Sequence, residues 1–232
     1  ELKMVLEIFL DGKMRYLFFL LILLSPELYG QKPNDLHKAG QYVFLLKGGF
    51  DLHYRGDLEE WLSKYGVKTN SNIVVNFGIK ALLPASRTLL IGGEFNWMIS
   101  NQPYKNDLSF DLELGKCFKI KTIQIIPLMG IGIVNSLIRF DNSVPAPLAQ
   151  LNASGGQLSQ NALLIKPNVL LIKNFYPFTF GIELGCRVYS FSNDWKYYEN
   201  GTNGSFIKVP QVPYNGYFHP YASIVLGLNV GY

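Results

Sequence analysis

Apolar and polar residues alternate along most of the chain from about residue 41 to its end. Alternation with a period of two residues indicates β-strands whose two faces meet different surroundings. The pattern occurs eight times, over the approximate ranges 41–54, 71–83, 88–100, 107–120, 122–135, 161–173, 178–190 and 219–232. It is less regular in the fifth range, where Ile126 and Leu128 fall on the nominally polar face and Pro127 interrupts the run. A proline inside a strand usually marks an edge or a bulge.

The connections between these segments alternate in length. Short connections fall at 84–87, 119–121 and 174–177, and longer ones at 55–70, 101–106, 136–160 and 191–218. Short turns at one end and longer loops at the other are typical of bacterial outer-membrane barrels, whose short turns face the periplasm. The pattern therefore predicts an all-β fold, an eight-stranded antiparallel up-and-down transmembrane β-barrel over residues 41–232. A soluble lipocalin-like carrier, with the same strands and the opposite face inward, is the alternative.

Volume decides which face of the strands points outward. The interior of an eight-stranded barrel is only just filled by side chains or holds one small ligand. The apolar face carries several bulky residues per strand and cannot fit inside, so we assign it to the outside. Aromatic residues near the strand ends of that face resemble the two interfacial girdles of such barrels. Tyr42, Phe118, Phe178, Phe180 and Tyr232 belong to the periplasmic end, and Tyr54, Trp97 and Phe110 to the outer end.

The face assigned to the lumen is rich in glycine and carries charges of both signs. Ten residues make up this predicted network: Lys47, Asp51, Lys80, Glu94, Asp111, Glu113, Lys119, Lys166, Glu183 and Arg187. An unpaired buried charge costs several kcal/mol, so charges in a narrow lumen must be paired or hydrated. We therefore predict a salt-bridged plug in place of an open channel.

Composition agrees with a barrel and excludes several other classes. The chain is 48% hydrophobic and only 16% charged, where about 25% charged is usual for a soluble domain. No internal segment is apolar for the ~20 residues that a membrane helix needs. The net charge of +4 is modest and its cations are scattered, so no nucleic-acid partner is expected. Cys117 and Cys186 form no CxxC motif and have no His at metal-ligand spacing, so no metal site is expected. A disulfide is possible in an exported protein, but the two side chains point to opposite faces of the sheet, which argues against it. No cofactor is expected.

The amino-terminal residues are predicted to be an export signal. Met14 and Arg15 precede the apolar run 16–24, and a plausible cleavage site follows Gly30. We therefore expect mis-assigned upstream residues at 1–13, a signal peptide at 14–30 and a periplasmic lead-in at 31–40. The alternative is a buried amino-terminal helix.

The carboxyl terminus carries the most specific likeness to a known family. Ile224, Leu226, Leu228, Val230 and Tyr232 resemble the terminal alternating strand that marks substrates of the barrel-assembly machinery. Residues 126–132 resemble the fifth strand of the OmpA/OmpX-like small outer-membrane barrels, and 166–168 the sixth. Over 41–232 the chain resembles this family. The resemblance implies export to the bacterial outer membrane, contact with periplasmic chaperones and the assembly machinery, residence in outer-membrane lipid, and often no enzymatic activity.

Candidate chemistry is sparse. No GxSxG, HExxH or phosphate-cradling motif occurs. His219 and Ser223 are four residues apart and so share a face, which is the lumen face. The active site of a lipid hydrolase would have to lie on the opposite, lipid-facing side. We therefore expect a monomeric, non-enzymatic outer-membrane barrel with a structural or surface-recognition role through its extracellular loops. The aromatic residues of loop 191–218 are equally consistent with recognition and with a cap. A lipid-modifying barrel enzyme and a narrow porin-like channel are the alternatives.

Overall fold

A computed structural model describes residues 42–52, 57–64, 73–86, 89–101, 104–140, 156–190, 193–199, 206–209, 212–213 and 218–230. The predicted upstream residues, signal peptide and lead-in lie outside these ranges. So do Tyr54 and Tyr232, and the side chains of Tyr42 and Val230 are not described either.

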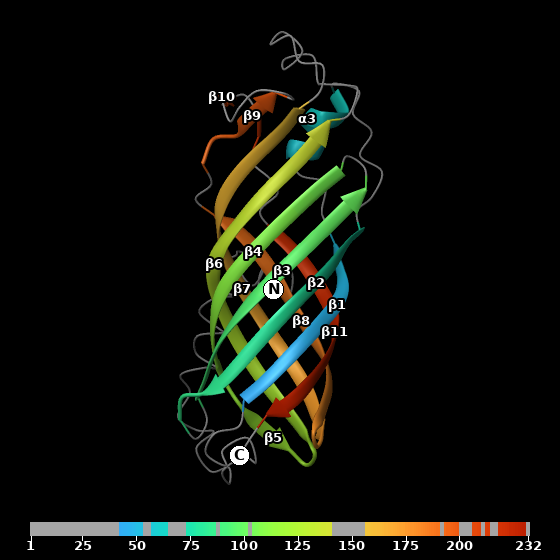
Figure 1. The fold of residues 1–232 in the computed structure, drawn as a ribbon, viewed down its shortest axis with the longest axis vertical. Helices are drawn as coiled ribbons and strands as arrows, with labels where there is room; N and C mark the ends of the chain where they lie inside the picture. Colours follow the sequence, from blue (N-terminus) through green and yellow to red (C-terminus); the bar gives the residue numbers. More distant parts are fainter. Residues whose placement is uncertain are drawn as a thin grey trace, which may run out of the picture.

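Eight long antiparallel strands form a closed barrel (Figure 1). They are β1 (Tyr42–Leu52), β2 (Ile73–Pro84), β3 (Leu89–Asn101), β4 (Tyr104–Lys116), β6 (Ile123–Phe140), β7 (Gly156–Phe175), β8 (Phe178–Ser190) and β11 (Phe218–Val230). Each pairs with its neighbour in the chain, and β1 pairs with β11 from Tyr42↔Val230 to Asp51↔Tyr221, which closes the ring. The predicted eight-stranded antiparallel barrel is confirmed.

Short turns join the strands at one end of the barrel, called here the turn end, and the longer connections lie at the other, the loop end. At the turn end the three-residue strand β5 (Phe118–Ile120) pairs with the start of β6. At the loop end two expected connections are shorter than predicted. The register of β3 with β4 runs to Asn101↔Tyr104, so strand pairing takes up most of the expected loop 101–106. The register of β6 with β7 continues to Phe140↔Gly156, so much of 136–160 is strand.

A small cap covers the loop end of the barrel, as one of the two interpretations of loop 191–218 allows, and it contains regular elements that the sequence did not predict. It consists of helix α3 (Asp57–Lys64) and the short strands β9 (Lys196–Glu199) and β10 (Ile207–Lys208), seen at the top of Figure 1. Leu58 and Leu62 are four positions apart, so they share one helical face, and both are buried. They pack with Ile138, Leu158, Trp195, Tyr197, Val209 and Val212. This apolar cluster explains why β6 and β7 extend so far. Among the described residues, no helix is long and apolar enough to cross a membrane.

The turn end of the lumen is filled by an apolar layer. Its buried members are Val43, Leu45, Leu82, Leu90, Cys117, Ile126, Leu128, Leu170, Ile172 and Val225. Ile126 and Leu128 are the residues that break the alternation of their strand, and both are fully buried. The break in alternation at these two residues therefore reflects their place in this apolar layer. We call the layer the apolar floor.

Candidate functional site

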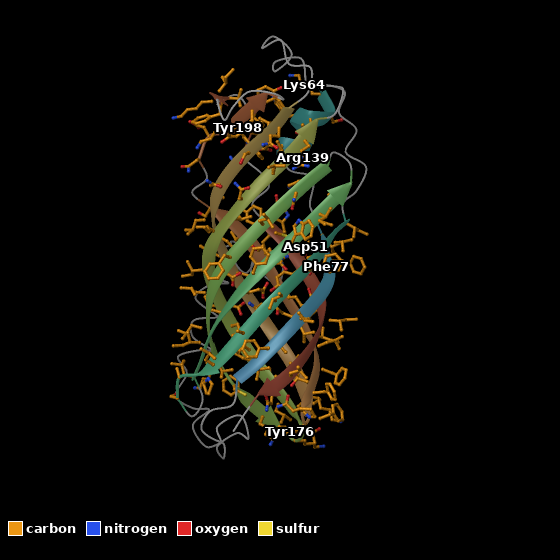
Figure 2. All side chains as sticks on the ribbon, in the orientation of Figure 1. Asp51, Lys64, Phe77, Arg139, Tyr176 and Tyr198 are labelled. Carbon is orange, nitrogen blue, oxygen red and sulfur yellow. The ribbon has the colours of Figure 1, made fainter. Side chains whose placement is uncertain are left out.

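The outer wall of the barrel is apolar. Phe77 points outward from β2 in Figure 2, and 52% of its surface is exposed. Large apolar residues are exposed on the same outward face all around the ring, including Leu46, Phe95, Leu112, Ile131, Ile182 and Leu226. A continuous exposed apolar wall of this extent is not compatible with water and is the surface that outer-membrane barrels present to lipid. It also excludes the soluble-carrier alternative, which requires the apolar face inward.

The predicted aromatic girdles are found in part. Phe178 and Phe180 are exposed toward the turn end, and Trp97 and Phe110 are exposed on the outward face. Phe118 does not belong to the exposed girdle that the sequence predicts, because only 9% of its surface is exposed. The regular strand β4 ends at Lys116, and the Lys116 ammonium then lies 5.4 Å from the centre of the Phe118 ring and helps to cover it.

The interior contains a buried charge layer above the apolar floor. Nine of the ten charged residues predicted for the lumen lie in it, namely four cations and five carboxylates. They come from six of the eight long strands: Lys47, Asp51, Lys80, Glu94, Asp111, Glu113, Lys166, Glu183 and Arg187. Figure 2 shows Asp51 at the middle of the barrel. Their burial means that each charge must be compensated by a neighbour.

Three lysines each contact more than one carboxylate. Lys166 Nζ lies 3.0, 2.9 and 3.0 Å from oxygens of three residues: Glu94, Asp111 and Glu113. Lys80 Nζ lies 3.1, 2.9 and 2.7 Å from oxygens of Glu94, Glu113 and Glu183. Lys47 Nζ is 2.5 Å from Glu94 and 3.2 Å from Glu183. Because the carboxylates are shared among the lysines, the layer is one connected network.

A second group on the loop side of these lysines is held by Arg187. Its guanidinium forms an ion pair with Asp51, and the Asn76 amide also donates to Asp51. The Ser223 hydroxyl donates to Asn76 Oδ1 at 3.0 Å. The Arg187 guanidinium lies 4.2 Å from the centre of the Tyr221 ring. These contacts link β8, β1, β2 and β11 across the closure of the barrel.

Lys119 lies apart from the network, which corrects the predicted set of ten. It stands on β5 at the turn end, where it is paired in register with Gln124 and is half-buried. The apolar floor, with Ile126 and Leu128 on the adjoining strand, separates it from the charge layer. Period-two alternation predicts which face of a strand a residue occupies but not its position along the barrel axis. The break between β4 and β5 places Lys119 nearer the turn end than the other charges.

The glycines of the lumen face leave space for the charged side chains. A Cβ at Gly78 would lie 3.1 Å from Cε of Lys47, and one at Gly130 would lie 2.8 Å from Oδ1 of Asp111. Contacts this short are tighter than ordinary van der Waals contact, so larger residues would displace the network. The glycine-rich character of this face therefore serves the packing of the long ionic side chains.

Uncharged polar residues of the network are those that sequence reasoning missed. The Tyr221 hydroxyl donates to Glu183 Oε1 at 2.5 Å, and Asn168 Nδ2 donates to Glu113 Oε1 at 3.1 Å. Their only sequence signal is their position on the inward face of a strand. Which carboxylate they meet depends on the register of strands distant in the chain.

Three carboxylates of the charge layer lie close enough together to hold a metal ion. Oxygens of Glu94, Glu113 and Glu183 lie within 4.8 Å of one another, the only such group among the described residues. Each of these carboxylates already contacts Lys80, so its ammonium occupies the position that a cation would take. The donor set is thus satisfied by the protein's own cations.

The possible catalytic pair also faces the lumen. His219 and Ser223 are both buried in the interior, and the Ser223 hydroxyl is engaged with Asn76. The His219 ring packs at 4.9 Å against that of Tyr189. The pair therefore lies on the opposite side of the wall from lipid. His37 and His53 lie outside the described residues. Cys117 is buried in the apolar floor, and no disulfide joins it to Cys186.

The exposed residues of the predicted assembly signal lie on the outer wall. Ile224, Leu226 and Leu228 are exposed along β11, on the same face as the other wall residues. Val230 is paired with Tyr42 at the end of the strand.

Solved structures share this architecture. No protein-family model matches the sequence, and no curated protein matches it. Neisserial surface protein A is similar over 83% of this chain and 98% of its own, with 8% identity and a TM-score of 0.52. A major outer membrane protein from Thermus thermophilus is similar over 82% of this chain and 99% of its own, with 10% identity and a TM-score of 0.55. Identity this low establishes a common fold and nothing more.

The closed antiparallel ring, its apolar outer wall and these similar structures define a transmembrane β-barrel of the outer-membrane class. Within that class the chain has the fold of the OmpA/OmpX-like small barrels, as the sequence predicts.

Proposed function

We propose that this chain is a non-enzymatic integral protein of the bacterial outer membrane, with a closed lumen and a structural or recognition role at the cell surface. The observation that carries the proposal is the charge layer above the apolar floor, enclosed by an apolar outer wall. Such an interior stabilises a barrel and leaves the loop end as the surface available to partners.

Both alternatives are disfavoured by particular contacts. A lipid-modifying enzyme needs reactive groups on the lipid side, whereas His219 and Ser223 are buried on the lumen side. A channel needs a hydrated path, whereas the lumen is crossed by an apolar floor and by ion pairs among fully buried side chains. Opening the path requires moving both layers, since ions cross neither an apolar barrier nor a cluster of satisfied charges readily.

Export and assembly belong to the same proposal. The apolar run 16–24 would direct secretion, after which periplasmic chaperones and the barrel-assembly machinery would deliver the chain to outer-membrane lipid as a monomer. The turn end would face the periplasm and the capped loop end the cell exterior. The exposed alternating residues of β11 would serve as the assembly signal.

The test combines location, gel mobility and conductance. We expect the protein in the outer-membrane fraction, with different mobility in SDS before and after boiling because the closed barrel resists the detergent. Reconstituted in a planar bilayer, it should give no stepwise current. A protein that is soluble without detergent and unaffected by boiling would refute the membrane assignment, and steady unitary currents would refute the closed lumen.

A further inference from the structure

A groove crosses the outer wall where β1 meets β11 and the ring closes. Its volume is about 280 Å³. Its walls are two neighbouring rows of exposed apolar side chains, each row continued from strand to strand by the register. The row nearer the turn end contains Phe178, Leu228 and Phe44, and the other row contains Leu226, Leu46 and Ile79.

The floor of the groove is formed by backbone. Leu45 and Gly227 line it and are partners in register between the two rows. Leu45 is buried, and a Cβ at Gly227 would point inward to within 2.5 Å of Leu45 Cδ2, so neither residue turns a side chain toward the groove. One water molecule takes up about 30 Å³ in the liquid, so the groove has room for about nine groups of methylene size. Every residue that lines it is apolar, which suits a hydrocarbon chain.

A lysine stands at the β7 side of the groove. Phe178 pairs in register with Phe175 of β7, and the Phe175 ring packs edge-on against Phe180 with the ring centres 6.0 Å apart. The Lys173 ammonium lies 4.8 Å from the centre of the Phe175 ring. Lys173 pairs with Phe180, and Phe180 pairs with Leu226, so this lysine continues one wall of the groove. The apolar groove therefore approaches a cation.

This cation lies where a lipid headgroup is expected. Figure 2 shows Tyr176 at the turn end, and Lys173 precedes it by three residues, about 10 Å along the chain. Ile123 of β6 is the other register partner of Lys173, so the segments 116–126 and 168–182 adjoin each other. Together they contain four lysines and no Asp or Glu. This part of the turn end therefore attracts anions.

We propose that the groove holds one acyl chain of an anionic phospholipid of the inner leaflet and that Lys173 binds the phosphate of that lipid. The inference rests on the proposed membrane location and orientation, which place the turn end at the periplasmic leaflet. A chain lying in the groove contacts both walls and the floor, and so gains more dispersion contacts than a chain on a flat wall. Lys173 would donate a charge-assisted hydrogen bond to a phosphate oxygen. The neighbouring lysines favour a lipid with net negative charge.

The experiment measures which lipid stays bound to the full chain in detergent, by native mass spectrometry. The protein is mixed with equal amounts of phosphatidylglycerol and phosphatidylcholine that have identical acyl chains, after gel mobility has confirmed folding. We expect one phosphatidylglycerol to be retained per barrel in preference to phosphatidylcholine. The groove variant is Leu46→Trp, which fills the groove, and Leu228→Trp fills it from the opposite wall if the first variant does not fold. The headgroup variant is Lys173→Gln.

Each variant has a matched control elsewhere on the molecule. Leu112→Trp adds the same bulk to the outer wall at β4, and Lys64→Gln removes an exposed cation from the cap. We expect retention of phosphatidylglycerol to fall at least about fivefold in the groove and headgroup variants and less than about twofold in the controls. In Lys173→Gln the preference over phosphatidylcholine should also disappear.

Three results would overturn the inference. They are equal retention in the groove variant and its control, equal retention of the two lipids by the unmodified protein, and a lipid-free dimer that Leu46→Trp dissociates. The last result would make the groove an interface between copies of the chain. Failure of the proposed function would instead appear as unchanged gel mobility on boiling, whatever lipid is retained.

Discussion

At the scale of single residues, the barrel interior depends on lysines that each compensate several carboxylates. Lys166 contacts three of them, and its side chain is fully buried. Lys166→Met removes the cation and leaves Glu94, Asp111 and Glu113 close together without it. Removing one partner of a buried ionic group typically costs about 3–5 kcal/mol. We expect a loss of that size in the free energy of unfolding, measured by urea titration in detergent with tryptophan fluorescence.

The control for this substitution lies on the same strand. Lys173 is exposed on β7, and its ammonium lies 4.8 Å from the centre of the Phe175 ring. Lys173→Met should cost less than about 1 kcal/mol, because exposed cation–π contacts are weak. Equal losses in the two variants would mean that the buried network does not stabilise the barrel in the way its contacts indicate.

At the scale of elements, helix α3 is expected to fold as part of the cap, separately from the barrel below it. Leu58→Ala should loosen the cap, since shortening a fully buried leucine costs about 2–5 kcal/mol. With Trp61 and Trp97 replaced by Phe, the buried Trp195 becomes the sole tryptophan and reports on this cluster. We expect faster acrylamide quenching and a red-shifted emission, while the unboiled gel band stays at the barrel position.

Glu60→Ala provides the comparison within the same helix. Glu60 is exposed, so its replacement should leave the quenching of Trp195 unchanged. If Leu58→Ala also abolished the unboiled band, the cap and the barrel would be one cooperative unit, contrary to this expectation.

At the scale of the whole molecule, closure joins strands from opposite ends of the barrel sequence. Leu46 of β1 and Leu226 of β11 are partners in register, and both are exposed on the outer wall. With Cys117 and Cys186 replaced by Ala, the pair Leu46→Cys and Leu226→Cys should oxidise to a disulfide in the folded barrel. The boiled, non-reduced chain would then migrate faster than the reduced chain, because the cross-link makes the unfolded molecule more compact.

A mismatched pair tests whether this result depends on register. Leu184 of β8 pairs with Ala222 and is not adjacent to β1. Leu46→Cys with Leu184→Cys should therefore remain reduced. A disulfide in both pairs, or in neither, would contradict the observed order of strands at the closure.

The sequence predicted the strands better than it predicted their ends or the cap. Alternation located all eight long strands, because each has one face against lipid and one against the lumen. It placed the end of β6 too early and the beginning of β7 too late, since Ile138 and Leu158 continue the strands into a cap cluster. Helix α3 escaped notice because an eight-residue element with two buried leucines is too short to give a clear periodic signal.

The sequence predicted which residues make up the candidate site but not which of them contact one another. Nine of the ten proposed charges lie in one layer, because inward position follows directly from alternation. The exception is Lys119, which lies on β5 at the turn end of the barrel, away from the charge layer. The partners were not predictable, since Lys47 and Glu183 are 136 positions apart and meet only after the ring has closed.

The sequence by itself determined the strand order, the two unlike faces and most of the buried charges. These are local properties, set by alternation along each strand and by the limited volume inside a small barrel. Only the tertiary structure decided which cation meets which carboxylate, that an apolar floor lies below them, and that an apolar groove crosses the outer wall where β1 meets β11. Those features depend on the register between strands, a non-local quantity that the residues of one strand do not specify alone.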